Sequence, residues 1–184
     1  MRKNPSDSRK QPPQIAPLVR GPRNKKEKGE LAELAFLHKA ASLGFGVSKP
    51  YGDSERYDFI LDSGERFWRV QVKSTSSRPG RGRSGYIVPS HTGRGRTVKP
   101  YKAEEIDFFV VYIVPRDVWY VVPVNQVAPF QCLSFYPSGC RIGGYFERYR
   151  EAWHLMAPGA DLKPQPGTLR RVRTIDFHRK HFGE

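Results

Sequence analysis

The stretch from Asn24 to Leu43 constrains the fold most, because it has the pattern of a helix with almost no polar face. Asn24 can cap this helix, with Glu27 three residues later, and Gly44 can end it. Its apolar positions are Leu31, Ala32, Leu34, Ala35, Phe36, Leu37, Ala40, Ala41 and Leu43. A helix this apolar is expected to be largely buried, and His38 is expected to lie in the core with it.

Short runs with strand-like composition follow the helix. Gly46 to Lys49 is weak, Tyr57 to Asp62 is clearer, and Phe67 to Ser74 is strong in β-branched and aromatic residues. Asp62-Ser63-Gly64 marks a tight connection between the last two runs. These two strands are therefore expected to pair as a hairpin.

Further elements complete one domain over residues 24–157. Ile106 to Val114 and Trp119 to Val122 predict a second hairpin, and Glu147 to Met156 predicts a helix. The order of elements indicates a mixed α/β (α+β) fold, with the N-terminal helix packed on a central mixed β-sheet. Residues 1–23 lack a hydrophobic period and are expected to be a disordered basic arm, whereas residues 158–184 are expected to form a Pro-rich basic tail.

Side-chain alternation along the first hairpin gathers polar groups on one face. The residues expected on that face are Asp58 and Ile60 from one strand and Arg69, Gln71 and Lys73 from the next. The residues expected on the opposite face are Tyr57, Phe59, Leu61, Trp68, Val70 and Val72. Pairing through the short turn can set Asp58 beside Gln71 and Lys73, so that a carboxylate, an amide oxygen and an ammonium meet.

The N-terminal helix adds two acids to this region. Glu30 and Glu33 lie three residues apart and therefore share a face that continues through Leu37 and Ala40. Carboxylates on an apolar stripe are costly to bury unless a cation compensates. A hard divalent cation held by oxygen ligands and backed by Lys73 would supply that compensation.

The charge balance indicates a polyanionic partner. Lys and Arg number 32 against 18 Asp and Glu, which gives a formal net charge of +14. Between Arg66 and Ala103 there is no acidic residue, and the segment from Ser76 to Pro100 is rich in Gly and Arg, with Tyr86 to Val88 as one short strand. The candidate contacts to DNA there are Arg78, Arg81, Arg83, His91, Arg94, Arg96, Lys99 and Lys102.

Several classes of protein do not fit this sequence. No apolar run approaches the roughly 20 residues of a membrane span, and no secretory signal is recognisable. Cys132 and Cys140 are too few for a disulfide framework and lack the further ligands of a zinc site, so a reducing cytoplasm is the expected compartment, with association to the nucleoid when DNA is bound.

The motif residues resemble the PD-(D/E)xK nuclease superfamily. The matching elements are the helix acid in Gly29-Glu30-Leu31-Ala32-Glu33, the strand acid in Tyr57-Asp58, and Gln71-Val72-Lys73 on the next strand. The region Lys28 to Val127 is most similar to the endonuclease family associated with group I introns, and more distantly to archaeal-type Holliday junction resolvases. Gln71 departs from the superfamily pattern, where an acid is more usual.

The resemblance implies a restriction-endonuclease-like core and a Mg²⁺-dependent endonuclease that cuts double-stranded DNA. Asp58, Gln71 and the Val72 carbonyl would hold Mg²⁺, for which Mn²⁺ would substitute, and Glu33 would reach it directly or through water. Glu30 is the alternative helix acid. Lys73 would orient the attacking water and offset developing charge.

Three points stay open at this level. Arg69 could touch the phosphate or simply be a charge on the strand surface. The substrate could be a specific site or a DNA junction, and loss of the acid at Gln71 would also suit a DNA-binding protein without activity. Cutting both strands requires two active sites, so a homodimer or homotetramer is expected.

Overall fold

The computed structural model describes residues 24–52, 54–77, 85–93, 98–139 and 144–160 of the 184-residue chain. The expected arm at 1–23 and most of the expected C-terminal tail lie outside these residues. So do Cys140 and the loop arginines Arg78, Arg81, Arg83, Arg94 and Arg96. Cys132 is within them, as a free thiol.

The N-terminal helix, α1, spans Lys25–Ser42, as the sequence predicts. Asn24 caps it, because its side-chain oxygen accepts a hydrogen bond from the Glu27 amide at 2.9 Å. Gly44, at a φ of 90°, follows the end of the helix in the left-handed conformation that glycine tolerates best.

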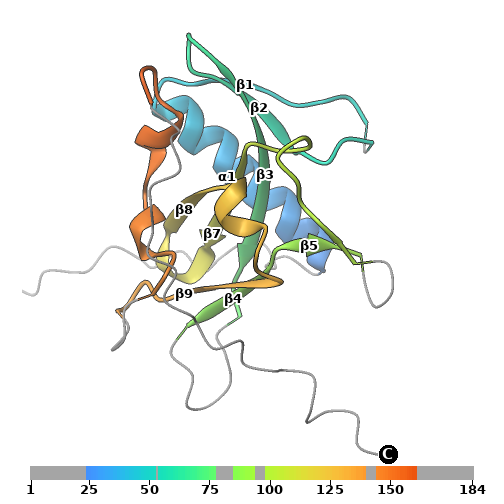
Figure 1. Cartoon of the computed structure of the whole chain (residues 1–184), viewed down its shortest axis with the longest axis vertical. Helices are drawn as coiled ribbons and strands as arrows, with labels where there is room; N and C mark the ends of the chain where they lie inside the picture. Colours follow the sequence, from blue (N-terminus) through green and yellow to red (C-terminus); the bar gives the residue numbers. More distant parts are fainter. Residues whose placement is uncertain (1–23, 53, 78–84, 94–97, 140–143, 161–184) are drawn as a thin grey trace, which may run out of the picture.

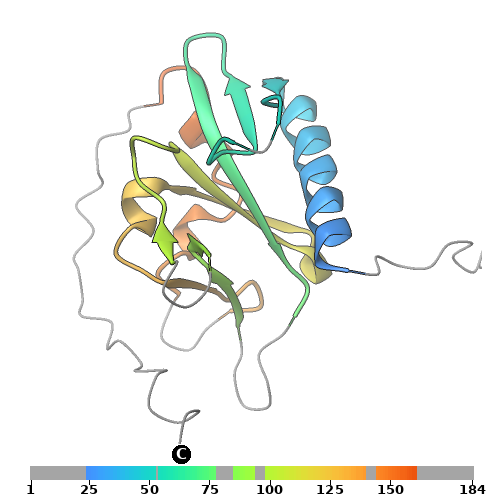
Figure 2. The ribbon, with the colours of Figure 1, turned by 90° about the vertical axis from the view of Figure 1, so that its right-hand side faces the viewer.

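The expectation that α1 is largely buried was wrong. Its buried residues are Ala32, Phe36 and Ala40, whereas Leu31, Leu34 and Leu37 are 51%, 63% and 42% exposed. His38 is exposed as well and is not a core residue. The physical reason is that α1 forms an outer layer on the sheet, so only one stripe of the helix is covered (Figure 2).

A five-stranded mixed sheet, in the order β1-β2-β3-β7-β8, forms the centre of the fold. Its strands are β1 (Gly46–Ser48), β2 (Phe59–Asp62), β3 (Phe67–Thr75), β7 (Phe108–Ile113) and β8 (Val118–Pro123). Neighbouring strands are antiparallel except for β3 and β7, which are parallel. Both expected hairpins, β2–β3 and β7–β8, are present; in the first, the Gly64 amide donates to the Asp62 carboxylate at 2.8 Å.

Apolar clusters cover both faces of this sheet. Phe36 and Ala40 of α1 pack with Phe59, Val70 and Val110 on one face. The other face is covered by the two-stranded sheet of β4 (Tyr86–Pro89) and β9 (Cys132–Phe135) and by the short helix α2 (Val124–Val127) (Figures 1 and 2).

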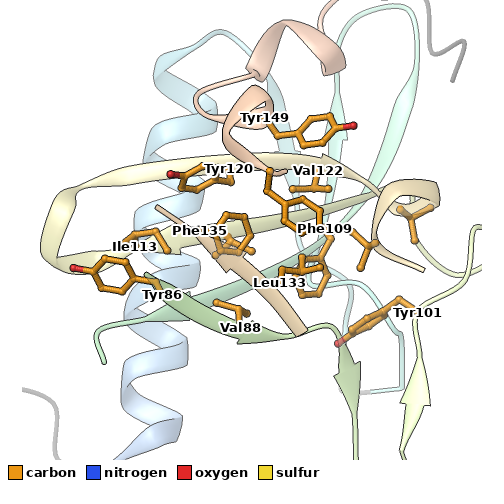
Figure 3. Packing of buried hydrophobic residues seen from close by; sticks show 14 of the residues in the cluster. Tyr86, Val88, Tyr101, Phe109, Ile113, Tyr120, Val122, Leu133, Phe135 and Tyr149 are labelled. Atoms are coloured by element: carbon orange, nitrogen blue, oxygen red, sulfur yellow. The ribbon is translucent and has the colours of Figure 1, made fainter. Parts of the chain in front are cut away.

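The second cluster is rich in aromatic side chains. In Figure 3 Leu133 and Phe135 lie against Phe109 and Tyr120 of the central sheet, and Tyr86 lies beside Ile113. The glycine-rich segment is therefore only partly a loop, because β4 is anchored by pairing with β9 and by burial of Tyr86. It also holds β5 (His91–Thr92), which pairs with β6 (Lys99–Pro100).

The helix expected over Glu147–Met156 is instead two short 3₁₀ helices, η3 (Glu147–Tyr149) and η4 (Trp153–Met156). Glu151 separates them with a φ of 47°, which an α-helix cannot accommodate. Its carboxylate accepts hydrogen bonds from the Trp119 amide at 2.8 Å and the Trp153 indole at 2.9 Å. The bond to Trp119, 32 residues earlier, is a tertiary contact that favours the break over a continuous helix.

Candidate active site

Asp58 lies immediately before β2, where β3 continues without its antiparallel partner. The Asp58 amide donates to the Val70 carbonyl at 2.9 Å, which continues the ladder by one bond. Its carboxylate oxygen Oδ2 then accepts from the Val72 amide at 2.7 Å and from the side-chain amide of Gln71. The carboxylate thus satisfies a β3 amide that β2 no longer reaches, which fixes Asp58 at the strand end.

The Gln71 side chain connects two oxygen atoms that belong to different groups. Its Nε2 donates to Asp58 Oδ2 and, at 3.1 Å, to the carbonyl of Val72. The Gln71 side chain is buried, so this arrangement is shielded from bulk water. If the side-chain amide of Gln71 were flipped, its oxygen would take the place of Nε2. The Gln71 amide oxygen, Asp58 Oδ2 and the Val72 carbonyl oxygen would then lie close together as three possible metal ligands. Oxygen ligands of this kind suit Mg²⁺ or another hard cation, and the donor set therefore fits.

Burial has the largest effect on the ionisation of Asp58. Burial raises the pKa of this carboxyl from 3.8 to about 6, and Glu33 adds to the rise, whereas the Val72 amide, Lys73 and Lys49 oppose it. A carboxylate that is costly to ionise gains more from a bound cation than an exposed one.

In the metal-free protein, Asp58→Asn is expected to raise the free energy of unfolding at about pH 8 by about 1–3 kcal/mol. The folded-state pKa of Asp58 lies above its ordinary value, so the wild type loses stability as the pH rises from 3.8 to about 6, and the full cost remains above that range. Asparagine keeps an oxygen acceptor for the Val72 amide and cannot ionise.

Urea unfolding in EDTA at about pH 8 and about pH 4 measures this effect. The gain should be much smaller at the lower pH, where Asp58 is protonated in the folded state and about half protonated in the unfolded state. An equal gain at both pH values would assign the effect to packing rather than to charge.

Glu33 approaches the site from α1. Its carboxylate accepts a hydrogen bond from Lys49 Nζ at 2.7 Å, and this bond is the main reason that the pKa of Lys49 is raised. Glu30 is more exposed, at 57% against 26% for the Glu33 side chain, and it pairs with Lys26 at 4.0 Å. The geometry therefore favours Glu33 over Glu30 as the helix acid.

Lys49 was not among the site residues predicted from the sequence. It follows a weak three-residue strand, and nothing in its neighbourhood indicates a partner 16 residues earlier. A hollow of about 210 Å³ lies beside Lys49. It is lined by Glu30, Glu33, Leu34, Leu37, Lys49 and Phe59.

Arg69 is engaged by the protein itself. Its guanidinium forms two hydrogen bonds with the Asp107 carboxylate, at 3.0 and 3.1 Å, and it also donates to the carbonyls of Ala103 and Glu104. The Asp107 bond raises the pKa of Arg69 further. These contacts favour a role in holding the loop before β7 over a contact to phosphate.

The alternation expected around Asp58 holds within the strands and fails just outside them. Phe59 and Leu61 pack on the α1 side with Trp68, Val70 and Val72, as expected. Tyr57, however, packs in the opposite cluster. Because β2 begins only at Phe59, the side chains before it need not alternate between the two faces of the sheet.

Some candidate DNA contacts lie within the described residues. Lys99 and Lys102 are exposed, and His91 is half-buried on β5. The register Thr92↔Lys99 and His91↔Pro100 joins β5 and β6 into one hairpin, whose connecting residues 94–97 lie outside the described ranges. Within the described ranges no three His, Cys, Asp or Glu side chains group as a metal site, so the candidate site depends on an amide and a carbonyl beside Asp58 and Glu33.

Comparisons with known proteins agree on one kind of relative. A family model described as PD-(D/E)XK endonuclease matches residues 23–134. Among solved structures, a bacterial homing endonuclease, I-Ssp6803I, is similar with a TM-score of 0.65 and 31% sequence identity, over 73% of this chain and 93% of that chain. A search of the curated proteins found no match.

Proposed function

Because the chain belongs to the PD-(D/E)XK endonuclease family, we propose that it is a Mg²⁺-dependent enzyme that hydrolyses phosphodiester bonds in double-stranded DNA at specific sites. The observation that carries the proposal is the convergence of Asp58 Oδ2 and the Val72 carbonyl on the Gln71 amide. The similarity to a homing endonuclease supports recognition of a specific site.

The residues of the proposed site have different roles. Asp58, Gln71 and the Val72 carbonyl would hold Mg²⁺, with Glu33 beside it, and the bound ion would supply Lewis acidity to the phosphate and lower the pKa of its water. Lys73 follows the ligand carbonyl on β3, and its charge acts on Asp58. Its ammonium would orient the attacking water and stabilise negative charge on the phosphate in the transition state. Lys49 would keep the Glu33 carboxylate turned towards the site.

Plasmid cleavage tests the proposal directly. The protein should nick or cut plasmid DNA that carries its site in Mg²⁺ or Mn²⁺, and EDTA should stop the reaction. Comparing that plasmid with random duplex and with a four-way junction tests the class of substrate. Preference for the junction would contradict site-specific cleavage, and binding without cleavage in either metal would contradict the enzymatic proposal.

Two copies of the chain would supply the two active sites that a double-strand break needs. The outward face of α1 suits such pairing because it carries Leu31, Leu34 and Leu37, all exposed. An antiparallel match centred on Leu34 would set Leu31 against Leu37 and Glu30 against His38, since each pair is symmetric about position 34. In that arrangement leucine would face leucine, and a carboxylate would face an imidazole.

Leu34→Glu is expected to convert the protein to a monomer that nicks one strand but makes few double-strand breaks, because two carboxylates would face each other across the two-fold axis. Sedimentation equilibrium and a supercoiled-plasmid assay measure both effects. Phe67→Glu is the matched control, since Phe67 is a 70% exposed apolar residue on β3 rather than on α1. If the Leu34→Glu protein sediments as an assembly of the same mass as the wild type, α1 is not the interface.

Within the described ranges no helix is long and apolar enough to cross a membrane.

A further inference from the structure

Arg56, two residues before Asp58, binds the hairpin formed by β5 and β6. Its Nη1 donates to the Thr92 hydroxyl at 2.6 Å, and its Nη2 donates to the Pro100 carbonyl at 2.9 Å. Thr92 belongs to β5 and Pro100 to β6, so one guanidinium contacts both strands of the hairpin. Nothing in the sequence pattern indicates this link, because the partners lie 36 and 44 residues away.

Two further groups contact the Arg56 guanidinium, whereas its buried Nε has no hydrogen-bond partner among the described residues. Glu105 pairs with Nη2 at 3.3 Å, and the ring of Tyr101 lies 4.7 Å from the guanidinium carbon. Tyr101 is 1% exposed and contacts Phe109 of the central sheet, with ring centroids 5.5 Å apart. Arg56 is therefore neutralised and clamped, which suits a fixed connection rather than a phosphate contact.

Arg56 is close in sequence to the candidate metal ligand Asp58, which follows it by two residues. Tyr57 packs in the same apolar cluster as Tyr101, and the Asp58 amide is held by the Val70 carbonyl. Any displacement of the hairpin acts on Arg56 and hence on the backbone that carries Asp58.

We propose that Arg56 is a positioning residue that couples the β5–β6 hairpin to the Asp58 carboxylate, so that DNA held by the hairpin and the metal held by Asp58 are placed in one geometry. This inference rests on the proposed function and on the prediction from the sequence that Lys99 of β6 contacts DNA. Arg56 itself touches neither substrate nor metal. It acts through Thr92, Pro100 and the backbone of residues 56–58.

Thr92 offers the sharpest test, because it is remote in sequence from every candidate catalytic residue. Thr92→Val removes the hydroxyl that accepts from Arg56 while keeping the shape of the side chain, and Thr92→Ser keeps the hydroxyl. Single-turnover cleavage of plasmid at saturating DNA should fall about tenfold in Thr92→Val, since a displacement of about 1 Å at a reacting group can cost up to about a hundredfold. Its DNA affinity should stay within about twofold, and Thr92→Ser should cleave at close to the wild-type rate.

Arg56→Lys provides the second arm. Lysine keeps the charge that pairs with Glu105 but cannot hold both strands of the hairpin, so it should also slow cleavage at saturating DNA. Combining it with Thr92→Val should add little further loss, because both changes break the same contact. Arg66→Lys is the matched control: Arg66 also lies over an aromatic ring, 4.8 Å from Trp68, but is outside the clamp.

The outcomes separate this inference from the proposed function. No metal-dependent cleavage by the wild type would contradict the proposed function. Cleavage by the wild type together with an unchanged rate in Thr92→Val, or an equal loss in Thr92→Ser, would contradict the role of Arg56 alone. Melting temperatures of the variants, measured alongside, should stay well above the assay temperature, so that the loss reflects positioning and not unfolding.

Discussion

Lys73→Ala and Asp58→Asn are each expected to slow DNA cleavage by about a thousandfold or more while DNA affinity stays within a few-fold. Lys73 loses the ammonium that would orient water and offset charge on the phosphate. Asp58→Asn loses the anionic metal ligand but keeps an oxygen that can accept from the Val72 amide. The fold should therefore survive both changes, and the losses would reflect chemistry.

Single-turnover cleavage and fluorescence anisotropy with labelled DNA measure the two quantities separately. Glu104→Ala is a suitable control, because Glu104 is exposed and contributes its backbone carbonyl, rather than its carboxylate, to the bond with Arg69. Cleavage at near the wild-type rate in either Lys73→Ala or Asp58→Asn would remove that residue from the catalytic centre.

The second large effect concerns Gln71. Gln71→Glu is expected to lower the Mg²⁺ concentration needed for half-maximal activity by about tenfold, because a carboxylate suits a hard cation better than an amide does. Without metal the same change should destabilise the protein, since it replaces a donor to Asp58 and the Val72 carbonyl with a second acceptor. Opposite shifts of thermal stability in EDTA and in Mg²⁺ are therefore the signature of metal ligation at this position.

Mg²⁺ titrations of activity and melting curves with and without the ion test this prediction. Gln71→Met is the control, because it keeps the length of the side chain and removes both oxygen and nitrogen, so it should need far more Mg²⁺. An inactive Gln71→Glu protein with normal stability in Mg²⁺ would indicate instead that the amide NH₂ itself is required, for example to contact phosphate.

The local geometry of the site could be predicted from the sequence. Two strands joined by a tight turn predict that Asp58 and Gln71 meet, and their side chains are hydrogen-bonded. The same pattern placed the Val72 side chain on the opposite face, and the contact of Val72 with Asp58 is made by its backbone amide. The capping of α1 by Asn24 is equally local. Both follow from residues close together along the chain, where spacing fixes distance.

Features that depend on distant partners could not be predicted in this way. Arg69 is bound by Asp107, 38 residues later, and Glu151 breaks the expected last helix through its bond to Trp119. The apolar pattern of α1 could not reveal which of its faces the sheet covers, so Leu34 and His38 were misplaced in the core. Each of these depends on tertiary contacts that local periodicity does not encode.

The central claim is that Asp58, Gln71 and the Val72 carbonyl share one divalent cation. Anomalous diffraction from crystals of the protein grown with Mn²⁺ and DNA tests it most directly. We expect one strong peak about 2.2 Å from a carboxylate oxygen of Asp58, the Gln71 amide oxygen and the Val72 carbonyl. No peak at this position in a crystal that binds DNA and Mn²⁺, with the Gln71 NH₂ still directed at Asp58, would contradict it.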